Sequence, residues 1–245
     1  MAEAVNTDTR RTALVTGATS GIGRAAALAL AADGFSVFVH GRDAGRGAAT
    51  VEAIELAGGH GKFVAVDLSD VRNVQQLADE VGDVDVLVNN GGFSWFGATP
   101  DLDAATFDAM FATNVRSAYY LVAALAPGMA KRGGGSIVSL SSMAGKVGLG
   151  GGAAYSASKV ALEAMTRAWA AEFSPAGVRV NAVAPGPTFS DGADASVIEQ
   201  LATATLMNRG ATVEEIGDVI AFLASPKAAY ITGAVIAVDG GRTAV

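Results

Sequence analysis

A tyrosine and a lysine four residues apart are the residues of this chain best suited to acid–base chemistry. Tyr155 and Lys159 lie in an alanine-rich stretch, residues 153–173, that contains no proline. If this stretch is helical, both side chains lie on one face, about one turn apart. A neighbouring ammonium group favours the phenolate and lowers the pKa of a phenol from about 10. The pair therefore predicts a general acid and base, although a solvated helix face is the commoner reason for this spacing.

A glycine-rich turn near the start of the chain has the pattern of a dinucleotide-binding site. The apolar run Thr12–Thr16 predicts a buried strand, and the run Arg24–Ala32 predicts a helix. Between them, Gly17 allows a tight turn, Gly21 allows close approach of a pyrophosphate, and Gly23 allows close packing of helix on strand. A strand, glycine turn and helix in this order aim backbone N–H groups at phosphate oxygens. Dinucleotide binding is therefore expected rather than a purely structural turn.

The second and third strands indicate which dinucleotide binds. The strand Phe35–His40 is followed by Arg42, with no carboxylate to hold an unphosphorylated ribose or to repel a phosphate. An arginine offers paired donors to a 2′-phosphate, so NADP is expected. NAD remains the alternative, with Arg42 capping the strand or pairing with Asp43. Asp67, after the third strand, is expected to accept a hydrogen bond from the adenine amine; the alternative is that it caps a helix starting near Val71.

Strand-like and helix-like runs alternate from residue 11 to the end, without a linker or an internal repeat. Alternation predicts a single α/β domain, residues 11–245, with a doubly wound, mostly parallel sheet and helices on both faces. Ligands bind such sheets at the carboxyl ends of the strands. Residues 1–10 are expected to form a disordered leader.

Composition excludes several other functions. The formal net charge of −7 argues against a nucleic-acid surface, which needs clustered lysine and arginine. The chain has no cysteine, so disulfides and thiolate chemistry are excluded, and its two histidines are too few for a histidine metal site. With no signal-peptide pattern and no apolar run long enough for a membrane helix, a cytoplasmic protein without a membrane or metal partner is expected.

Two segments beyond strand ends are candidates for substrate binding. The loop after the fourth strand carries Phe93, Trp95 and Phe96, which predicts an apolar substrate wall; packing of this loop on its own domain is the alternative. The weakly periodic segment Phe189–Gly210 suits a mobile lid, and a surface insertion without a role is the alternative. Asn114 lies between two helical runs and predicts a kink there.

Taken together, the chain resembles the short-chain dehydrogenase/reductase family over residues 11–242. Each matching motif is common alone, but their order and spacing are specific. The motifs are Thr16-Gly17-x-x-x-Gly21-x-Gly23, Asp67-Leu68, Asn89-Asn90-Gly91-Gly92, Asn114, Ser142, Tyr155-x-x-x-Lys159, Asn181, Pro185-Gly186 and Val238-Asp239-Gly240-Gly241.

The resemblance implies a single-domain Rossmann fold with a seven-stranded sheet and reversible hydride transfer between NAD(P)H and a carbonyl or alcohol. In this family's scheme, Tyr155 donates a proton to the carbonyl oxygen and Ser142 hydrogen-bonds that oxygen. Lys159 lowers the pKa of the tyrosine and holds the nicotinamide ribose, while Asn114 anchors a water in a proton relay. No metal is implied.

The resemblance also implies two sets of contacts. Cofactor contacts are expected from Gly17, Thr19, Ser20, Gly21, Ile22, Gly23, Arg42, Asp67, Leu68, Asn90, Gly91, Tyr155, Lys159, Pro185, Gly186 and Thr188. Substrate contacts are expected from Phe93, Trp95, Ser142, Met143, Leu149 and Tyr155.

Three positions depart from the family pattern. Alanine is commoner where Gly91 stands, and a hydroxyl is kept where Ser190 replaces threonine. Family members that use NADP often have a basic residue at the position of Ser20, so the 2′-phosphate is left to Arg42, with possible help from His40.

The leading hypothesis is an NADP(H)-dependent reductase of a ketone or aldehyde, or the reverse alcohol dehydrogenase, acting on a small-molecule substrate as a homotetramer. The first alternative is a 3-oxoacyl-[acyl-carrier-protein] reductase. Many of these enzymes have an arginine where this chain has Ala176, which leaves Lys131 and Arg132 as docking charges for an acidic carrier. The second alternative, from another class, is a non-catalytic dinucleotide sensor or scaffold.

Overall fold

Seven parallel strands form one sheet in the order β3-β2-β1-β4-β5-β6-β7. This computed structural model describes residues 10–245, so nearly all of the expected leader, residues 1–9, lies outside the described residues. The strands are β1 Thr12–Val15, β2 Ser36–Gly41, β3 His60–Ala65, β4 Val86–Asn89, β5 Gly135–Leu140, β6 Val178–Pro185 and β7 Val235–Val238. The expected doubly wound sheet is confirmed. The sheet was expected to be mostly parallel, and all of its described strand pairs are parallel.

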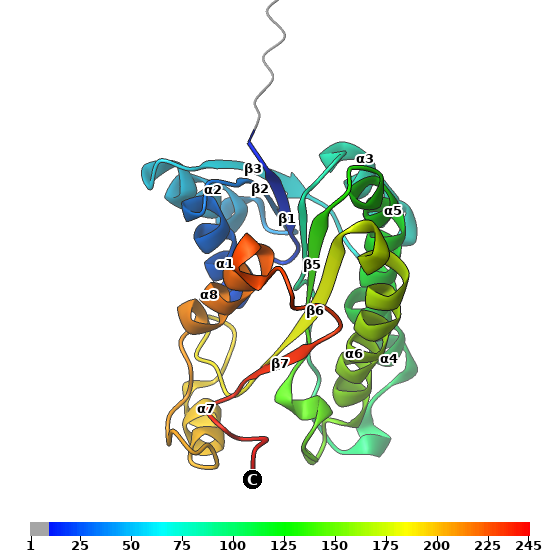
Figure 1. Cartoon of the computed structure of the whole chain (residues 1–245). Helices are drawn as coiled ribbons and strands as arrows, with labels where there is room; N and C mark the ends of the chain where they lie inside the picture. Colours follow the sequence, from blue (N-terminus) through cyan, green and yellow to red (C-terminus); the bar gives the residue numbers. More distant parts are fainter. Residues whose placement is uncertain (1–9) are drawn as a thin grey trace, which may run out of the picture.

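Helices cover both faces of the sheet (Figure 1). They are α1 Gly21–Ala32, α2 Ala44–Leu56, α3 Val71–Val81, α4 Ala104–Phe111, α5 Ser117–Lys131, α6 Ala153–Phe173, α7 Ala195–Ala202 and α8 Val213–Ala224. One buried cluster joins the sheet to α1, α2 and α8, and a second joins it to α3, α5 and α6. Because both faces are covered, central strands such as Thr12–Val15 are continuous apolar runs and do not alternate with polar residues.

The chain winds outward in opposite directions from β1 and β4, which are neighbours in the sheet. Val15 pairs with Val39 of β2 on one side and with Val88 of β4 on the other. The loops after β1 and β4 therefore diverge to opposite faces and leave a crevice at their carboxyl ends. A crevice of this kind is where open α/β sheets bind ligands.

The kink expected at Asn114 is a turn of π-helix, Ala112–Arg116, between α4 and α5. A π-helical turn widens the backbone and is found mostly at functional sites. Here it lets one long helical segment change direction beside the carboxyl edge of the sheet, close to α6, with which it makes contacts.

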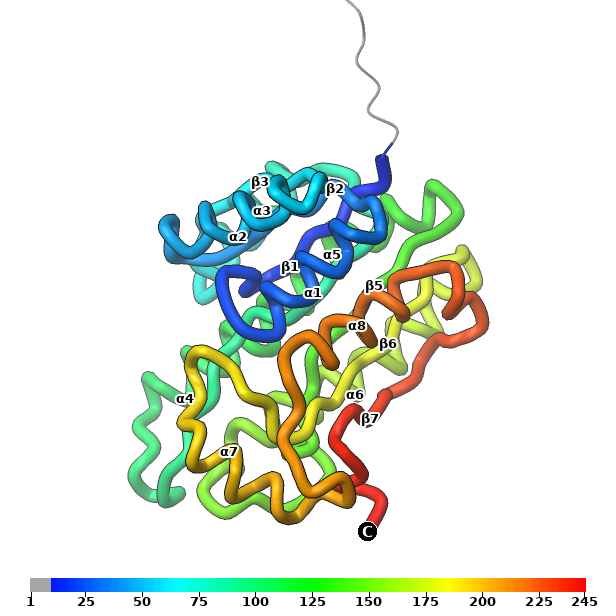
Figure 2. The backbone as a smooth tube through the Cα atoms, turned by 90° about the vertical axis from the view of Figure 1, so that its left-hand side faces the viewer, coloured from blue at the N-terminus to red at the C-terminus, as the bar shows by residue number. Residues whose placement is uncertain are grey.

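The segment Phe189–Gly210, expected to be a lid, begins and ends at neighbouring positions of the fold. Thr188 and Ala211 form a bridge, and the N–H of Ala211 donates to the carbonyl of Pro187. Within the segment, Asp194 caps the short helix α7, which lies near the C-terminus (Figures 1 and 2). The segment is therefore a folded excursion over the carboxyl edge. Among residues 10–245, no helix combines the length and apolar character needed to cross a bilayer.

Candidate active site

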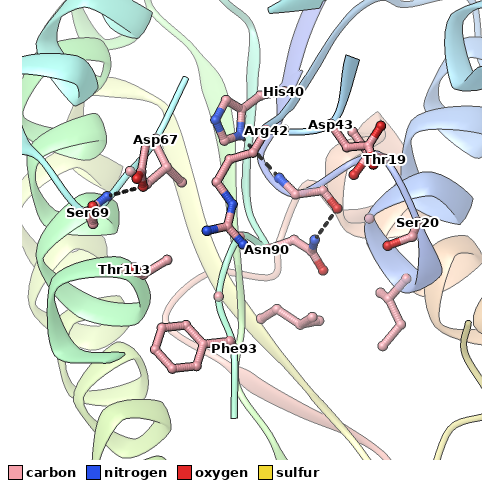
Figure 3. A pocket seen from close by; sticks show the side chains of 18 of the residues that line it. Thr19, Ser20, His40, Arg42, Asp43, Asp67, Ser69, Asn90, Phe93 and Thr113 are labelled. Carbon is pink, nitrogen blue, oxygen red and sulfur yellow. Dashed lines mark hydrogen bonds between the residues drawn. The ribbon is translucent and has the colours of Figure 1, made fainter. Parts of the chain in front are cut away.

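A cavity of about 700 Å³ runs along the carboxyl ends of β1 to β5 (Figure 3). Its volume is in the range of small-molecule and cofactor sites. Most of the residues expected to touch a cofactor line it. They are Gly17, Thr19, Ser20, Ile22, Gly23, Arg42, Asp67, Leu68, Asn90, Gly91, Tyr155 and Lys159, together with Phe93 from the expected substrate set.

The glycine turn is held by contacts that leave no room for a side chain. A Cβ at Gly23 would lie 2.2 Å from the carbonyl oxygen of Gly17 and 2.3 Å from Nδ2 of Asn90. That amide nitrogen donates to the carbonyl oxygens of Thr16, at 2.8 Å, and Gly17, at 3.1 Å. Gly17 itself has a positive φ of 65°. The first turn of α1 therefore lies directly against the ends of β1 and β4, as the spacing of the glycines predicts.

Thr16 completes this arrangement, although nothing in its sequence context predicted a separate role for its side chain. Its Oγ1 accepts hydrogen bonds from the backbone N–H groups of Asn90, at 3.0 Å, and Gly91, at 2.8 Å. A Cβ at Gly91 would lie 3.0 Å from Leu68 and 3.2 Å from Thr16 Oγ1. The glycine that replaces the family's alanine thus fits a tight site between the loops.

Arg42 reaches into the cavity between Asp67 and Asn90 (Figure 3). The alternative that it pairs with Asp43 is wrong, because Asp43 caps α2 and binds Arg46, with Nε of Arg46 3.0 Å from Oδ2. Among the described residues, Arg42 makes no ion pair. Its guanidinium group is therefore available to an anionic ligand in the cavity.

His40 does not supply a second positive charge. Its Nδ1 accepts from the N–H of Gly17 at 3.3 Å, and its Nε2 lies 3.0 Å from the carbonyl oxygen of Val66, to which it donates in the matching tautomer. Burial lowers the pKa of His40 to about 4, so the ring is neutral at physiological pH. The expected help with a phosphate is wrong. Instead, His40 ties the turn after β1 to the end of β3.

The end of β2 has no space for an acidic side chain. A Cβ at Gly41 would lie 2.3 Å from Cγ2 of Thr19. Asp67, one strand away, accepts from the N–H of Ser69 at 3.0 Å, and this hydrogen bond holds the pKa of its carboxyl group below the usual value. The alternative role for Asp67 as a helix cap is wrong, because Asp70 caps α3. Asp67 still lines the cavity, and its carboxylate can accept further hydrogen bonds.

Tyr155 and Lys159 lie on the first turns of α6, where Lys159 is buried and Tyr155 is half-buried, but their electrostatics differ from the expectation. Burial raises the pKa of Tyr155, and a hydrogen bond with the Ser142 side chain offsets only part of this. Nζ of Lys159 lies 5.7 Å from the centroid of the tyrosine ring and donates to the carbonyl oxygen of Leu140 at 2.8 Å. The pKa of Tyr155 is therefore raised in this structure, contrary to the expected lowering, because desolvation is the largest cause of the shift. The phenol holds its proton at neutral pH.

Ser142 and Asn114 frame the tyrosine from two other elements. Ser142 follows β5, and its Oγ accepts from the N–H of Ala144 at 3.2 Å. Nδ2 of Asn114 donates to the carbonyl of Phe93 at 2.9 Å and to Oγ of Ser158 at 3.1 Å, while its Oδ1 accepts from the N–H of Phe93 at 3.0 Å. The amide of Asn114 therefore fixes the loop after β4 to α6.

The three aromatic residues of that loop have different positions. Phe93 lines the cavity beside Thr113 (Figure 3). Trp95 packs on its own loop, because a Cβ at Gly97 would lie 2.7 Å from the indole ring. Phe96, the third residue of the predicted substrate wall, lies outside the lining of the cavity and packs on Tyr155. The expectation of an aromatic wall thus holds for Phe93, and packing on the loop itself holds for Trp95.

Several expected residues lie outside the lining of the cavity. These are Gly21, Trp95, Asn114, Ser142, Met143, Leu149, Pro185, Gly186 and Thr188. Gly186 packs on Asp239, and Thr188 donates to the carbonyl of Gly186 at 3.0 Å. Ser190 lines the cavity in their place, and it lies beside Gly21. Its position two residues beyond the Pro185–Thr188 turn is the signal by which it could have been assigned.

These residues fit a nicotinamide dinucleotide. A glycine turn at a helix N-terminus suits the pyrophosphate, the free guanidinium of Arg42 suits a ribose phosphate, and the far end of the cavity reaches Tyr155 and Lys159. The fold and the site together define a Rossmann-fold oxidoreductase that depends on NAD(P).

Comparison with known proteins gives the family. A family model described as Enoyl-(Acyl carrier protein) reductase matches residues 17–243. A 3-oxoacyl-[acyl-carrier-protein] reductase of Staphylococcus aureus is 36% identical over 239 residues, which cover 94% of this chain and 97% of the relative. The chain belongs to the short-chain dehydrogenase/reductase family.

Solved structures agree in fold and length. A short-chain dehydrogenase/reductase family protein superposes with a TM-score of 0.89 at 48% identity, covering 96% of this chain and 98% of the other. An angucycline C-6 ketoreductase with bound NADP gives a TM-score of 0.89 at 34% identity, with 96% of each chain covered.

The burial of Lys159 predicts a stability effect that depends on pH. Burial lowers the pKa of Lys159 from 10.5 to about 8, so between these pH values the unfolded chain binds more protons than the folded one. Wild-type stability is therefore reduced below pH 8 and recovers as the pH rises toward 10.5. We expect Lys159→Met to increase the free energy of unfolding relative to wild type most strongly below pH 8. This increase should disappear between pH 8 and 10.

Urea unfolding of the cofactor-free protein at several pH values measures this difference. Lys62→Met, at an exposed lysine, is the control and should show a smaller dependence. A difference between Lys159→Met and wild type that stays constant from pH 7 to 10 would contradict the account.

Proposed function

We propose that this enzyme uses NADPH to reduce an uncharged, partly apolar ketone or aldehyde to the alcohol. The observation that carries the proposal is the line of groups along one cavity, from the unpaired Arg42 at one end to Tyr155 and the buried Lys159 at the other. NADPH supplies a hydride to the carbonyl carbon when it is bound. The protein must hold the carbonyl, provide a proton and exclude water.

In the proposed mechanism, Tyr155 gives its phenolic proton to the carbonyl oxygen. A phenol whose pKa is raised by burial keeps that proton at neutral pH, so the protonated form that the reduction needs is present. Ser142, which bonds Tyr155, would also donate to the developing alkoxide and stabilise it. Lys159, charged below pH 8, would donate a hydrogen bond to a ribose hydroxyl of the cofactor.

In the proton relay expected around Asn114, we propose that the side chain of Asn114 has a positioning role. The hydrogen bonds of its amide group go to the protein, to Phe93 and Ser158. Any water of the relay would therefore be held by the widened backbone of the π-helical turn rather than by the Asn114 amide donors. By holding the Phe93 loop to α6, the amide supports the wall next to Tyr155.

The proposal favours NADP over NAD for two reasons. Arg42 is free of carboxylate partners among the described residues, and Gly41 cannot be replaced by an acidic residue without a clash with Thr19. A charged donor pair on a phosphate strengthens binding more than a neutral hydrogen bond does. A related ketoreductase has been solved with bound NADP.

We also propose a homotetramer. Large apolar side chains stay exposed on α5 and α6, namely Tyr119, Tyr120 and Val160. A helix pair with exposed aromatic rings and many alanines suits close packing against a second copy.

A 3-oxoacyl-[acyl-carrier-protein] reductase is the second candidate, favoured by the name of the Staphylococcus aureus relative. The positions of the basic residues that could bind an acidic carrier argue against this function. Lys131 ends α5 and Arg132 follows it, at the edge of the sheet opposite to Tyr155, and Arg132 pairs with Asp83. An acidic carrier docked on these two residues would not face the active site.

Replacement of Tyr155 tests the mechanism. We expect Tyr155→Phe to lower kcat by a factor of about 10² to 10⁴, because the general acid is lost, while the NADPH dissociation constant changes by less than about threefold. Tyr230→Phe, at a fully exposed tyrosine, is the matched control and should behave as wild type. Unchanged turnover in Tyr155→Phe would show that another group supplies the proton.

Replacement of Arg42 tests the choice of cofactor. By fluorescence titration, we expect Arg42→Ala to weaken NADPH binding about tenfold or more and to leave NADH binding nearly unchanged, since one charged hydrogen-bonding group contributes about 1.5–3 kcal/mol. Arg72→Ala, at an exposed arginine outside the cavity, is the control. Equal affinity of the wild type for both cofactors, or a preference for NADH, would favour an NAD-dependent dehydrogenase.

A comparison of substrates tests the carrier alternative. We expect carrier-bound and free 3-oxoacyl substrates to differ in kcat/KM by less than about tenfold, equivalent to about 1.4 kcal/mol. A larger preference for the carrier-bound substrate would make the second candidate the better function.

A further inference from the structure

Phe96 leaves a large apolar surface uncovered beside the proposed proton donor. Its ring centroid lies 5.5 Å from that of Tyr155, with the two planes inclined by 55°. This tilted contact is a favourable geometry for aromatic pairs. The side chain nevertheless remains 52% exposed. One part of the ring is therefore fixed by Tyr155 and another is free to contact a ligand.

Glycines on a distant segment hold Phe96 in this position. The N–H of Gly97 donates to the carbonyl of Gly151 at 3.1 Å, which ties the loop after β4 to the turn before α6. Gly151 has a positive φ of 76°, and a Cβ there would lie 2.8 Å from the carbonyl oxygen of Gly97. A Cβ at Gly152 would lie 2.8 Å from Cε1 of Phe96. The glycine run before α6 is thus required for the ring to rest over Tyr155.

The two chain segments that carry Phe96 and Tyr155 contain no charged residue. Residues 91–100, which carry Phe96, contain no Asp, Glu, Lys or Arg, and neither do residues 147–158, which carry Tyr155. These two segments therefore offer no counter-charge of their own to a substrate with a carboxylate or phosphate next to its carbonyl, although Lys159, one residue beyond, has its Nζ 5.7 Å from the centroid of the Tyr155 ring. A flat apolar group would instead gain contact area and an aromatic partner.

We propose that Phe96 determines substrate specificity by packing against an aryl group attached to the substrate carbonyl, so that the enzyme prefers aryl ketones. The proposal rests on the carbonyl reduction proposed above and names the substrate class for that same site. The ring of Phe96 and the hydroxyl of Tyr155 would hold two ends of one planar group. Phe96 would thereby orient the carbonyl oxygen toward the proton donor.

The experiment compares two methyl ketones, acetophenone and 2-butanone, with NADPH in wild type and in Phe96→Ala. We expect Phe96→Ala to lower kcat/KM for acetophenone about tenfold and kcat/KM for 2-butanone by less than about threefold. Phe96→Tyr keeps an aromatic ring and should keep the wild-type ratio. Phe222→Ala, which removes a similarly exposed ring on α8, is the matched control.

A second variant displaces the ring without removing it. Gly152→Ala places a methyl group against Cε1 of Phe96, and its negative φ accepts alanine without backbone strain. We expect Gly152→Ala, like Phe96→Ala, to lower the ratio of kcat/KM for acetophenone to kcat/KM for 2-butanone. NADPH affinity, measured by fluorescence, should stay at the wild-type value in all of these variants.

The outcomes separate this inference from the function on which it rests. Equal losses for both ketones in Phe96→Ala, or no loss, would overturn the specificity role while leaving the reductase function in place. If wild type binds NADPH but reduces neither ketone nor other aryl and alkyl carbonyls, the proposed function fails, and the inference fails with it.

Discussion

The absence of a side chain at Gly23 is the constraint on which the site depends. It allows the first turn of α1 to lie against the carbonyl of Gly17 and the amide of Asn90, where a Cβ would be only 2.2 Å from the former. The same amide then bonds the end of β1, and Thr16 bonds the backbone after β4 in return. Two strands and one helix thus meet at the point where the sheet reverses its winding. The N–H groups at the start of α1 consequently face the crevice that receives a phosphate.

Burial governs the chemistry at the other end of the cavity. Charged forms are disfavoured in a low-dielectric interior, so burial raises the pKa of Tyr155 and lowers that of Lys159. The two shifts move the pKa values apart, so the phenol of Tyr155 keeps its proton at neutral pH while the ammonium of Lys159 loses its proton more readily than an exposed lysine does. The reduced stability that comes with a buried lysine is the kind of cost that functional sites commonly carry.

Much of this molecule could be predicted from sequence because its signals are local. Alternating strand and helix patterns gave the doubly wound sheet, the glycine spacing gave the turn after β1, and the spacing of Tyr155 and Lys159 placed both on α6. Other features depend on contacts between distant segments and could not be predicted. The pKa of Tyr155 follows from burial rather than from its neighbour on the helix, and both ring nitrogens of His40 bond backbone groups on other strands. Phe96 was predicted as part of an apolar wall, but its contacts with Gly152 and Tyr155 depend on the fold.

The most direct test of the account follows the hydride itself. NADPH labelled with deuterium at C4 of the nicotinamide, as each of the two C4 epimers in turn, would be incubated with the enzyme and an aryl methyl ketone. The alcohol would then be analysed by mass spectrometry and NMR. The account predicts that one epimer places deuterium on the carbinol carbon, at a rate that depends on Tyr155. Alcohol without deuterium from either epimer, or no alcohol from any ketone, would contradict it.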